Sequence, residues 1–151
     1  QKINIIPFAV SDLENKFLLL REKNFTEGGA LNAYGVDYDY SGKKFDFSNS
    51  YITFGTNLDN LVKKKILKTP NYIKIDVDGI EDLILDGSKD ILIDKNLKSI
   101  LIEINDRFET QKNKIIQTMK NNNFELVFKK RNENYYKGDF DGIYNYIFRK
   151  N

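Results

Sequence analysis

The sequence contains no cysteine and no histidine. Without cysteine the chain forms no disulfide and offers no thiolate nucleophile. Without histidine it lacks the usual general base of neutral pH and the commonest zinc ligand. Acid or base chemistry in this chain must therefore come from carboxylates, lysines or tyrosines, and we expect no metal site.

Charge of one sign is also not in excess, because 24 basic and 22 acidic side chains leave a formal net charge of +2. The basic residues are scattered apart from short clusters at 63–65 and 129–131, which fit solvated ends of helices or strands. We therefore expect no nucleic-acid partner. No apolar run is long enough to cross a bilayer, and no leader pattern stands at the start. These absences predict a soluble, cytoplasmic protein.

The chain has 151 residues, of which 40% are hydrophobic, and this suffices for one ordinary core. We therefore expect a single domain over 1–151. The sequence starts at Gln1 without a methionine and enters a strand pattern almost at once. We expect it to be part of a longer chain.

Hydrophobic periodicity predicts alternating strands and helices. The expected strands are 3–10, 17–20, 51–55, 72–77, 99–104, 124–130 and 143–149, and the expected helices are 58–67, 80–93 with an interruption near Gly87, and 107–122. A capping box at 56–59 opens the first helix, and Ile115, Ile116 and Met119 line the inner face of the last one. The alternation favours an α/β fold, with a mostly parallel sheet, helices on both faces and a C-terminal antiparallel hairpin.

No period persists from 24 to 49, where glycines alternate with Tyr34, Tyr38 and Tyr40. Loops of this length inside a compact domain are usually functional or mobile, and a disordered insertion is the alternative. The tyrosine rings of this segment are suited to stacking against a sugar ring, and packing within the loop is the plainer interpretation.

Charged side chains alternate with apolar ones at the ends of two central strands. Lys74, Asp76 and Asp78 share one face if the strand stays extended through 78, and Glu103 and Asn105 share a face of the next strand. We expect Lys74 to pair with Glu103, which leaves Asp76 free to face a ligand. Ligands bind at the carboxyl ends of strands in open α/β sheets. A solvated network of charges without a ligand is the alternative.

The phrase Asp76-Val-Asp78-Gly79 also resembles the nucleophile strand of haloacid-dehalogenase-type phosphatases, in which paired aspartates take a phosphoryl group and hold magnesium. That family has Thr or Val after the glycine and a hydroxyl at the end of a later strand. This chain has Ile80 and Glu103 at those places. A magnesium-dependent phosphatase is therefore our third interpretation.

Residues 72–105 resemble the core pattern of the FkbM-type S-adenosylmethionine-dependent methyltransferases. In that family a strand reads Lys-x-Asp-x-Glu-Gly, then come x-Glu, an apolar helix with a Lys-Gly-Ala-like turn, and a strand ending in Glu. The matching residues here are Lys74, Asp76, Asp78 in place of the Glu, Gly79, Glu81, the turn Leu85-Asp86-Gly87-Ser88, and Glu103. Upstream, Thr56-Asn-Leu-Asp-Asn-Leu61 and Ala9-Val-Ser-Asp12 are similar to the family's Thr-x-Leu-Asp-x-Leu and Ala-Val-Ser-Asp motifs.

The resemblance implies a Rossmann-like methyltransferase sheet that binds S-adenosylmethionine and methylates a hydroxyl of a sugar or another small acceptor. It implies Asp76 and Glu103 as catalytic groups. The residues that it places at the cofactor are Ala9, Val10, Ser11, Asp12 and Asp76. Second choices in the same region are Lys74, Asp78, Glu81 and Asn105.

One motif of the family is missing. Its members bind the cofactor through a glycine-rich turn after the first strand, and this chain has no Gly-x-Gly. The resemblance therefore implies the C-terminal portion of the domain without its first strands, inactive alone, with the turn supplied from upstream. A non-catalytic α/β binding module derived from a methyltransferase is the alternative function.

Overall fold

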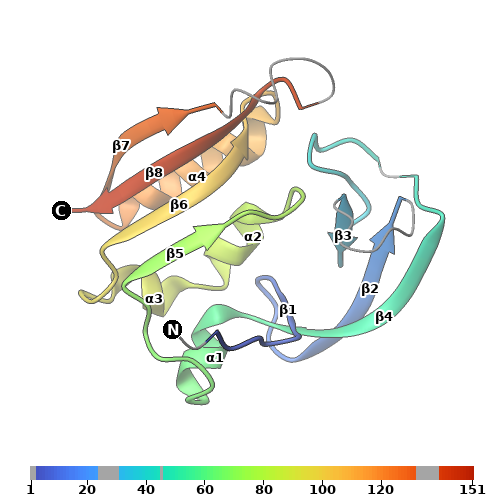
Figure 1. The fold of residues 1–151 in the computed structure, drawn as a ribbon, viewed down its shortest axis with the longest axis horizontal. Coiled ribbons are helices and arrows are strands. Elements are labelled where there is room, and N and C mark those ends of the chain that lie inside the picture. The colour runs from blue at the N-terminus through green and yellow to red at the C-terminus, as the bar shows by residue number, and fades with distance from the viewer. Residues whose placement is uncertain (1–2, 24–30, 45, 132–139) are drawn as a thin grey trace.

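A computed structural model describes residues 3–23, 31–44, 46–131 and 140–151. They form a mixed α/β fold with two four-stranded sheets, ordered β1-β4-β2-β3 and β5-β6-β8-β7 (Figure 1). The strands are β1 (Ala9–Val10), β2 (Lys16–Glu22), β3 (Asn32–Tyr34), β4 (Asn49–Thr56), β5 (Tyr72–Ile75), β6 (Ser99–Asn105), β7 (Phe124–Lys130) and β8 (Ile143–Lys150). The helices are α1 (Leu58–Lys63), α2 (Glu81–Asp86), α3 (Lys89–Ile93) and α4 (Glu109–Asn121). None of these helices is long and apolar enough to cross a membrane.

The first sheet is built around the long antiparallel pair of β2 and β4, which runs from Lys16 opposite Gly55 to Glu22 opposite Asn49. β3 adds antiparallel to β2, and β1 adds parallel to the far side of β4. Asn15, with φ of 52°, makes the left-handed turn into β2, a conformation that asparagine tolerates better than most residues. This sheet is therefore mainly a hairpin structure.

The second sheet pairs β5 with β6 in parallel, joined by the crossover that contains α2 and α3. β8 lies between β6 and β7 and is antiparallel to both, which confirms the predicted C-terminal hairpin. Of the six strand pairs in the described residues, only two are parallel, so the prediction of a mostly parallel sheet is wrong. Figure 1 shows α2 and α4 behind this sheet and no helix in front of it, whereas helices on both faces were expected.

The hydrophobic core lies between the second sheet and its helices. Ile100, Ile102 and Ile104 have no exposed surface because alternate residues of a strand share one face. On α4, Ile115 and Met119 are equally buried, four residues apart. The prediction for Ile116 is wrong, because its side chain turns outward and is 38% exposed.

The expected strand 3–10 is reduced to its last two residues, Ala9 and Val10. Ile3 and Ile5 are almost fully exposed, and Pro7 has no N–H to donate to a ladder. An apolar run of this kind becomes a strand only where a neighbouring strand offers partners, and none among the described residues does so before Ala9.

Helix α1 begins at Leu58, as predicted, but it ends at Lys63 rather than at 67. Thr56 is not its cap, because the cap residue is the one directly before the helix. Its cap is Asn57, whose side-chain oxygen accepts the N–H of Asn60 at 2.8 Å. Asp59 accepts the N–H groups of Asp90 and Ile91 at the start of α3. The carboxylate that was expected to complete a capping box on its own helix therefore caps a different one.

The segment 24–49 was expected to be irregular throughout, yet it contains β3 and the first residue of β4. Residues 24–30 and 45 lie outside the described part. The Tyr34 ring packs over Gly55, and its hydroxyl donates a hydrogen bond to the carbonyl of Lys16. The Tyr38 ring contacts Phe108 edge to face. For these two tyrosines the structure favours packing within the protein over stacking on a ligand.

Candidate functional site

The carboxyl ends of the parallel strands β5 and β6 bring Asp76 and Glu103 together. Asp76 follows β5, Glu103 is on β6, and their carboxyl groups share a hydrogen bond. The negative charge of Asp76 disfavours ionisation of Glu103, because two adjacent negative charges repel each other. The convergence that the sequence predicted is therefore present.

Lys74 pairs with a different carboxylate than expected. Its Nζ lies 2.5 Å from Oδ2 of Asp76, while its backbone partner in β6 is Leu101. Lys74 and Asp76 are two apart on one extended segment, so their side chains share a face and meet without crossing to β6. The predicted Lys74–Glu103 pair is wrong, and so is the expectation that Asp76 is left free, because Asp76 takes the ion pair itself. The ammonium charge still acts on Glu103 from a distance.

Glu103 has the properties of a base that works near neutral pH. Burial, first, and then the nearby Asp76 carboxyl together raise the pKa of the Glu103 carboxyl from 4.5 to about 7, against the lowering effect of the Lys74 ammonium. Since a pKa near 7 leaves part of the carboxyl ionised at physiological pH, Glu103 can accept a proton and later release it.

A cavity of about 360 Å³ opens beside Asp76, between the two sheets. One side of it comes from the first sheet and the segment before it, and the other from the residues after β5. Its lining residues are Phe8, Ala9, Val10, Leu20, Asn32, Tyr34, Asp76, Val77, Asp78, Ile80 and Ile84. The sequence placed Ala9, Val10 and Asp76 together, and the structure does so. It did not find Phe8, Asn32 or Tyr34, because no local pattern reveals which residues of one sheet face another.

Asp78 connects the two sheets. Its Oδ2 accepts the backbone N–H groups of Leu31, at 2.7 Å, and Asn32, at 3.0 Å. Leu31 has φ of 70°, an uncommon conformation for leucine, which these bonds help to hold. Asp78 therefore lines the cavity while acting as a structural acceptor.

We expect Asp78→Ala to lower the free energy of unfolding by about 1–3 kcal/mol, because two partly buried N–H groups lose their acceptor. Asp78→Asn retains an acceptor oxygen and is expected to recover part of the loss. Urea unfolding measures both, with Asp37→Ala as the control at an exposed aspartate nearby. An equal, small effect of all three substitutions would show that Asp78 does not hold the sheets together.

Ser11 and Asp12 are not among the residues that line this cavity. Ser11 is buried, its N–H donates to the carbonyl of Thr56, and its Oγ accepts the N–H of Leu13. The backbone of both residues lies against Gly87, where an added Cβ would come within 2.3 Å of the Ser11 carbonyl oxygen. Their visible role is to fit the turn after β1 against the junction of α2 and α3.

Glu81 begins α2 and is 4% exposed. Its Oε1 accepts the N–H of Gly79 at 3.3 Å, and its Oε2 has no hydrogen-bond partner among the described residues. Burial raises the pKa of this carboxyl from 4.5 to about 8, against the lowering effect of the N–H groups of Glu81 and Gly79 and of the nearby Gln111 amide. The side chain is therefore mostly protonated at neutral pH.

A second, much smaller cavity of about 10 Å³ lies between Glu81 and Glu103. Its lining residues are Tyr40, Val77, Glu81, Glu103, Asn105, Gln111 and Ile143. Asn105 is committed to the backbone, because its Nδ2 donates to the carbonyl of Tyr40 and its Oδ1 accepts the N–H of Arg107. Asn105 therefore anchors the segment that carries Tyr40.

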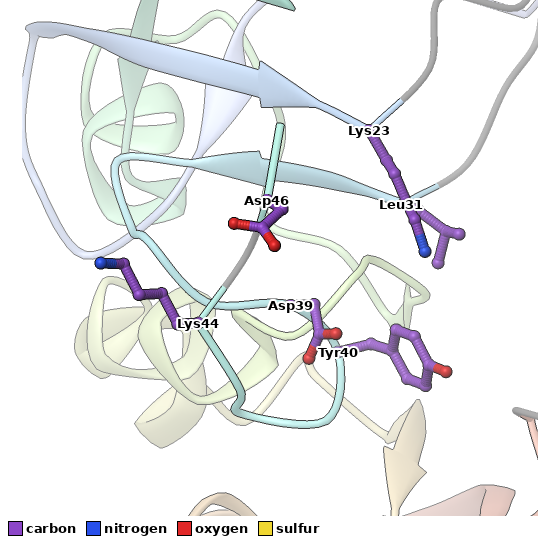
Figure 2. A pocket seen from close by; sticks show the side chains of 6 residues that line it. All are labelled: Lys23, Leu31, Asp39, Tyr40, Lys44 and Asp46. Carbon is purple, nitrogen blue, oxygen red and sulfur yellow. The ribbon is translucent and has the colours of Figure 1, made fainter. Parts of the chain in front are cut away.

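A third cavity, of about 200 Å³, is also lined by Tyr40 (Figure 2). Its lining residues are Lys23, Leu31, Asp39, Tyr40, Lys44 and Asp46. Asp39 closes a turn, since its Oδ1 accepts the N–H and the hydroxyl of Ser41. Figure 2 shows Lys23 and Leu31 on the same side as the Tyr40 ring, with Lys44 extending away from them. Tyr40 thus lines both this mixed-charge cavity and the small cavity at Glu103.

Within the described residues, no three His, Cys, Asp or Glu side chains gather closely enough to hold a metal ion.

Comparison with known proteins gives one match. A family model described as Methyltransferase FkbM domain matches residues 1–126 of the 151. No curated protein and no solved structure matches the chain. The matched part contains the 360 Å³ cavity, the Asp76–Glu103 pair and Glu81.

Proposed function

The chain belongs to the FkbM methyltransferase family, and from this premise we propose that it forms part of an S-adenosylmethionine-dependent enzyme that methylates a hydroxyl group. The observation that carries the proposal is the Asp76–Glu103 pair on two adjacent strands, in which Asp76 lines the 360 Å³ cavity and Glu103 lines the small cavity next to it. An acceptor hydroxyl has a high pKa, so a base must take its proton as the new bond forms. Glu103 is that base, and Asp76 orients it.

The lining of the 360 Å³ cavity fits S-adenosylmethionine. Its volume lies within the range of small-molecule pockets, roughly 300–1,000 Å³. Ala9, Val10 and Ile84 offer apolar surface to a flat adenine ring, and the Asp76 carboxylate offers negative charge to a positively charged group. S-Adenosylmethionine supplies an electrophilic methyl group on a sulfonium. The chain's own contribution is to position the acceptor and to remove its proton.

The acceptor, in our proposal, is a saccharide or another polyhydroxylated molecule that approaches from the side of Tyr40. Tyr40 borders both the small cavity at Glu103 and the 200 Å³ cavity of Figure 2. An aromatic ring gives a sugar an apolar face to stack on, and the nearby Asp46 and Lys23 are suited to hydrogen-bonding its hydroxyls. In this proposal the acceptor hydroxyl reaches the cofactor's methyl group at the Asp76–Glu103 pair, where Glu103 can take its proton as the methyl group is transferred.

Binding of S-adenosylhomocysteine, measured by isothermal titration calorimetry, tests the proposal. We expect a version of the chain extended upstream to bind it, because the glycine-rich turn of the family would then be present. Ala9→Leu, which fills the cavity, should weaken binding at least tenfold, and the exposed Glu14→Ala should not.

Two other results of this titration would count against the proposal. Absence of binding by both the chain and its extended version would favour a non-catalytic binding module. Equal binding by Ala9→Leu and the unaltered protein would place the cofactor outside the 360 Å³ cavity.

A further inference from the structure

The proposed reaction does not use the most deeply buried carboxyl group near the site. Glu81 is 4% exposed, and its Oε2 has no hydrogen-bond partner among the described residues. Burying a polar atom without a partner costs free energy, so such an atom usually serves a function or binds an ordered water. Glu81 therefore requires an explanation beyond packing.

Burial is the main reason that Glu81 keeps its proton, and one neighbouring charge adds to its effect. Asp82 follows it on α2, and its negative charge opposes ionisation of Glu81. The Gln111 amide on α4 lies nearby, yet it donates to the carbonyl of Gly79 and to Oδ1 of Asp82. Lys114, also on α4, pairs with Asp82 and Asp86. The Tyr38 hydroxyl, on the segment before β4, interacts with the charges of this cluster, and burial together with those charges raises its pKa above the usual 10, so it is neutral at physiological pH.

The small cavity joins Glu81 to Glu103. Its volume of about 10 Å³ is close to the minimum that one water molecule requires. Its polar lining consists of Tyr40, Asn105, Gln111 and the two glutamates, and Asn105 and Gln111 have partners in the protein. Glu81 and Glu103 are the two carboxyl groups that one water in this cavity can connect. An acid that donates and a carboxylate that accepts are complementary across such a water.

We propose that Glu81 is a positioning residue for Glu103. In its acid form it donates a hydrogen bond to a single water in the shared cavity, and this water donates to the Glu103 carboxylate. The bond favours the ionised form of Glu103 and fixes its orientation toward Asp76. The role of this contact in catalysis rests on the proposed function. The water-mediated contact between Glu81 and Glu103 does not depend on it.

NMR titration of the chain, labelled with ¹³C at the glutamate carboxyl groups, tests the contact without any methyl transfer. The Glu103 signal is assigned by its loss in Glu103→Gln. In the unaltered protein it should titrate near pH 7 and show a second, smaller inflection near pH 8, as Glu81 ionises. In Glu81→Gln, which keeps a donor of the same shape, the second inflection should disappear and the main midpoint should move by less than about 0.3 units.

Glu81→Leu removes the donor, and there the midpoint of Glu103 should rise by about 0.5–1 unit. The exposed Glu125→Gln is the control and should leave the Glu103 curve unchanged. A second inflection that persists in Glu81→Gln, or a midpoint that stays the same in Glu81→Leu, would overturn the proposal. Glu81→Gln alone decides the matter if Glu81→Leu fails to fold. Because the measured signal is that of the Glu103 carboxyl, this titration tests the Glu81–Glu103 contact whether or not the chain binds S-adenosylhomocysteine.

Discussion

Glu103→Gln is expected to lower kcat for methyl transfer by about 10²–10⁴-fold in the upstream-extended enzyme, because an amide cannot accept the proton of the acceptor hydroxyl. Gln preserves the shape of the side chain and a hydrogen bond to Asp76. Affinity for S-adenosylhomocysteine should therefore change by less than about threefold, which separates loss of the base from loss of binding.

The pH dependence of kcat/KM gives a second readout of the same group. Burial and Asp76 raise the pKa of Glu103 to about 7, so activity should rise with pH up to this value as the base ionises. The Glu125→Gln control, altered at an exposed position, should keep both the rate and the profile. A Glu103→Gln enzyme that retains more than a tenth of the turnover would exclude Glu103 as the base.

Glu81→Gln is expected to stabilise the folded chain more at high pH than at low pH. The difference in free energy of unfolding between Glu81→Gln and the unaltered chain should be up to about 5 kcal/mol larger at pH 8.5 than at pH 4.5. The pKa of Glu81 is raised from 4.5 to about 8 in the folded state, and each unit corresponds to about 1.4 kcal/mol. Below pH 4.5 the carboxyl is protonated in both the folded and the unfolded state. As the pH rises toward 8, the unfolded chain releases this proton while the folded chain retains it, so stability falls.

Urea unfolding of the two proteins at several pH values measures this effect. The free energy of unfolding of Glu81→Gln minus that of the unaltered chain should grow from pH 4.5 to pH 8 and then level off. Taking the difference cancels the contributions of titrating groups that do not interact with Glu81. A difference that is the same at pH 5 and pH 8 would show that Glu81 ionises in the folded protein as it does in water.

The sequence predicted the elements of the second sheet well, because their signals are local. β7 has the predicted bounds, and the interruption at Gly87 separates α2 from α3. The meeting of Asp76 and Glu103 followed from a general rule, since sequential parallel strands end at the same edge of a sheet. The sequence was therefore sufficient to predict that two residues at the ends of neighbouring parallel strands lie close together.

Long-range partners were not predictable from the sequence. The role of Asp78 depends on the backbone of Leu31 and Asn32, more than forty residues earlier in the chain. Lys74 pairs with Asp76, on its own extended segment. The expectation that neighbouring strands pair favoured Glu103 on β6, but it gave no means of deciding between Asp76 and Glu103 as the partner of Lys74. The burial of Glu81 depends on α4, whose packing no local pattern around Glu81 reveals. From the sequence, these residues could therefore be named as candidates, but the groups that they contact could not be predicted.

The proposed role of Glu103 depends on the Asp76 carboxyl beside it. We therefore expect the Glu103 carboxyl to titrate near pH 7 in the unaltered chain and at a clearly lower pH in Asp76→Asn, because the neighbouring negative charge is then gone. ¹³C NMR titration of the Glu103 carboxyl in both proteins measures this difference. A Glu103 pKa near 4.5 in both proteins would show that Asp76 and burial do not prepare Glu103 to act as a base.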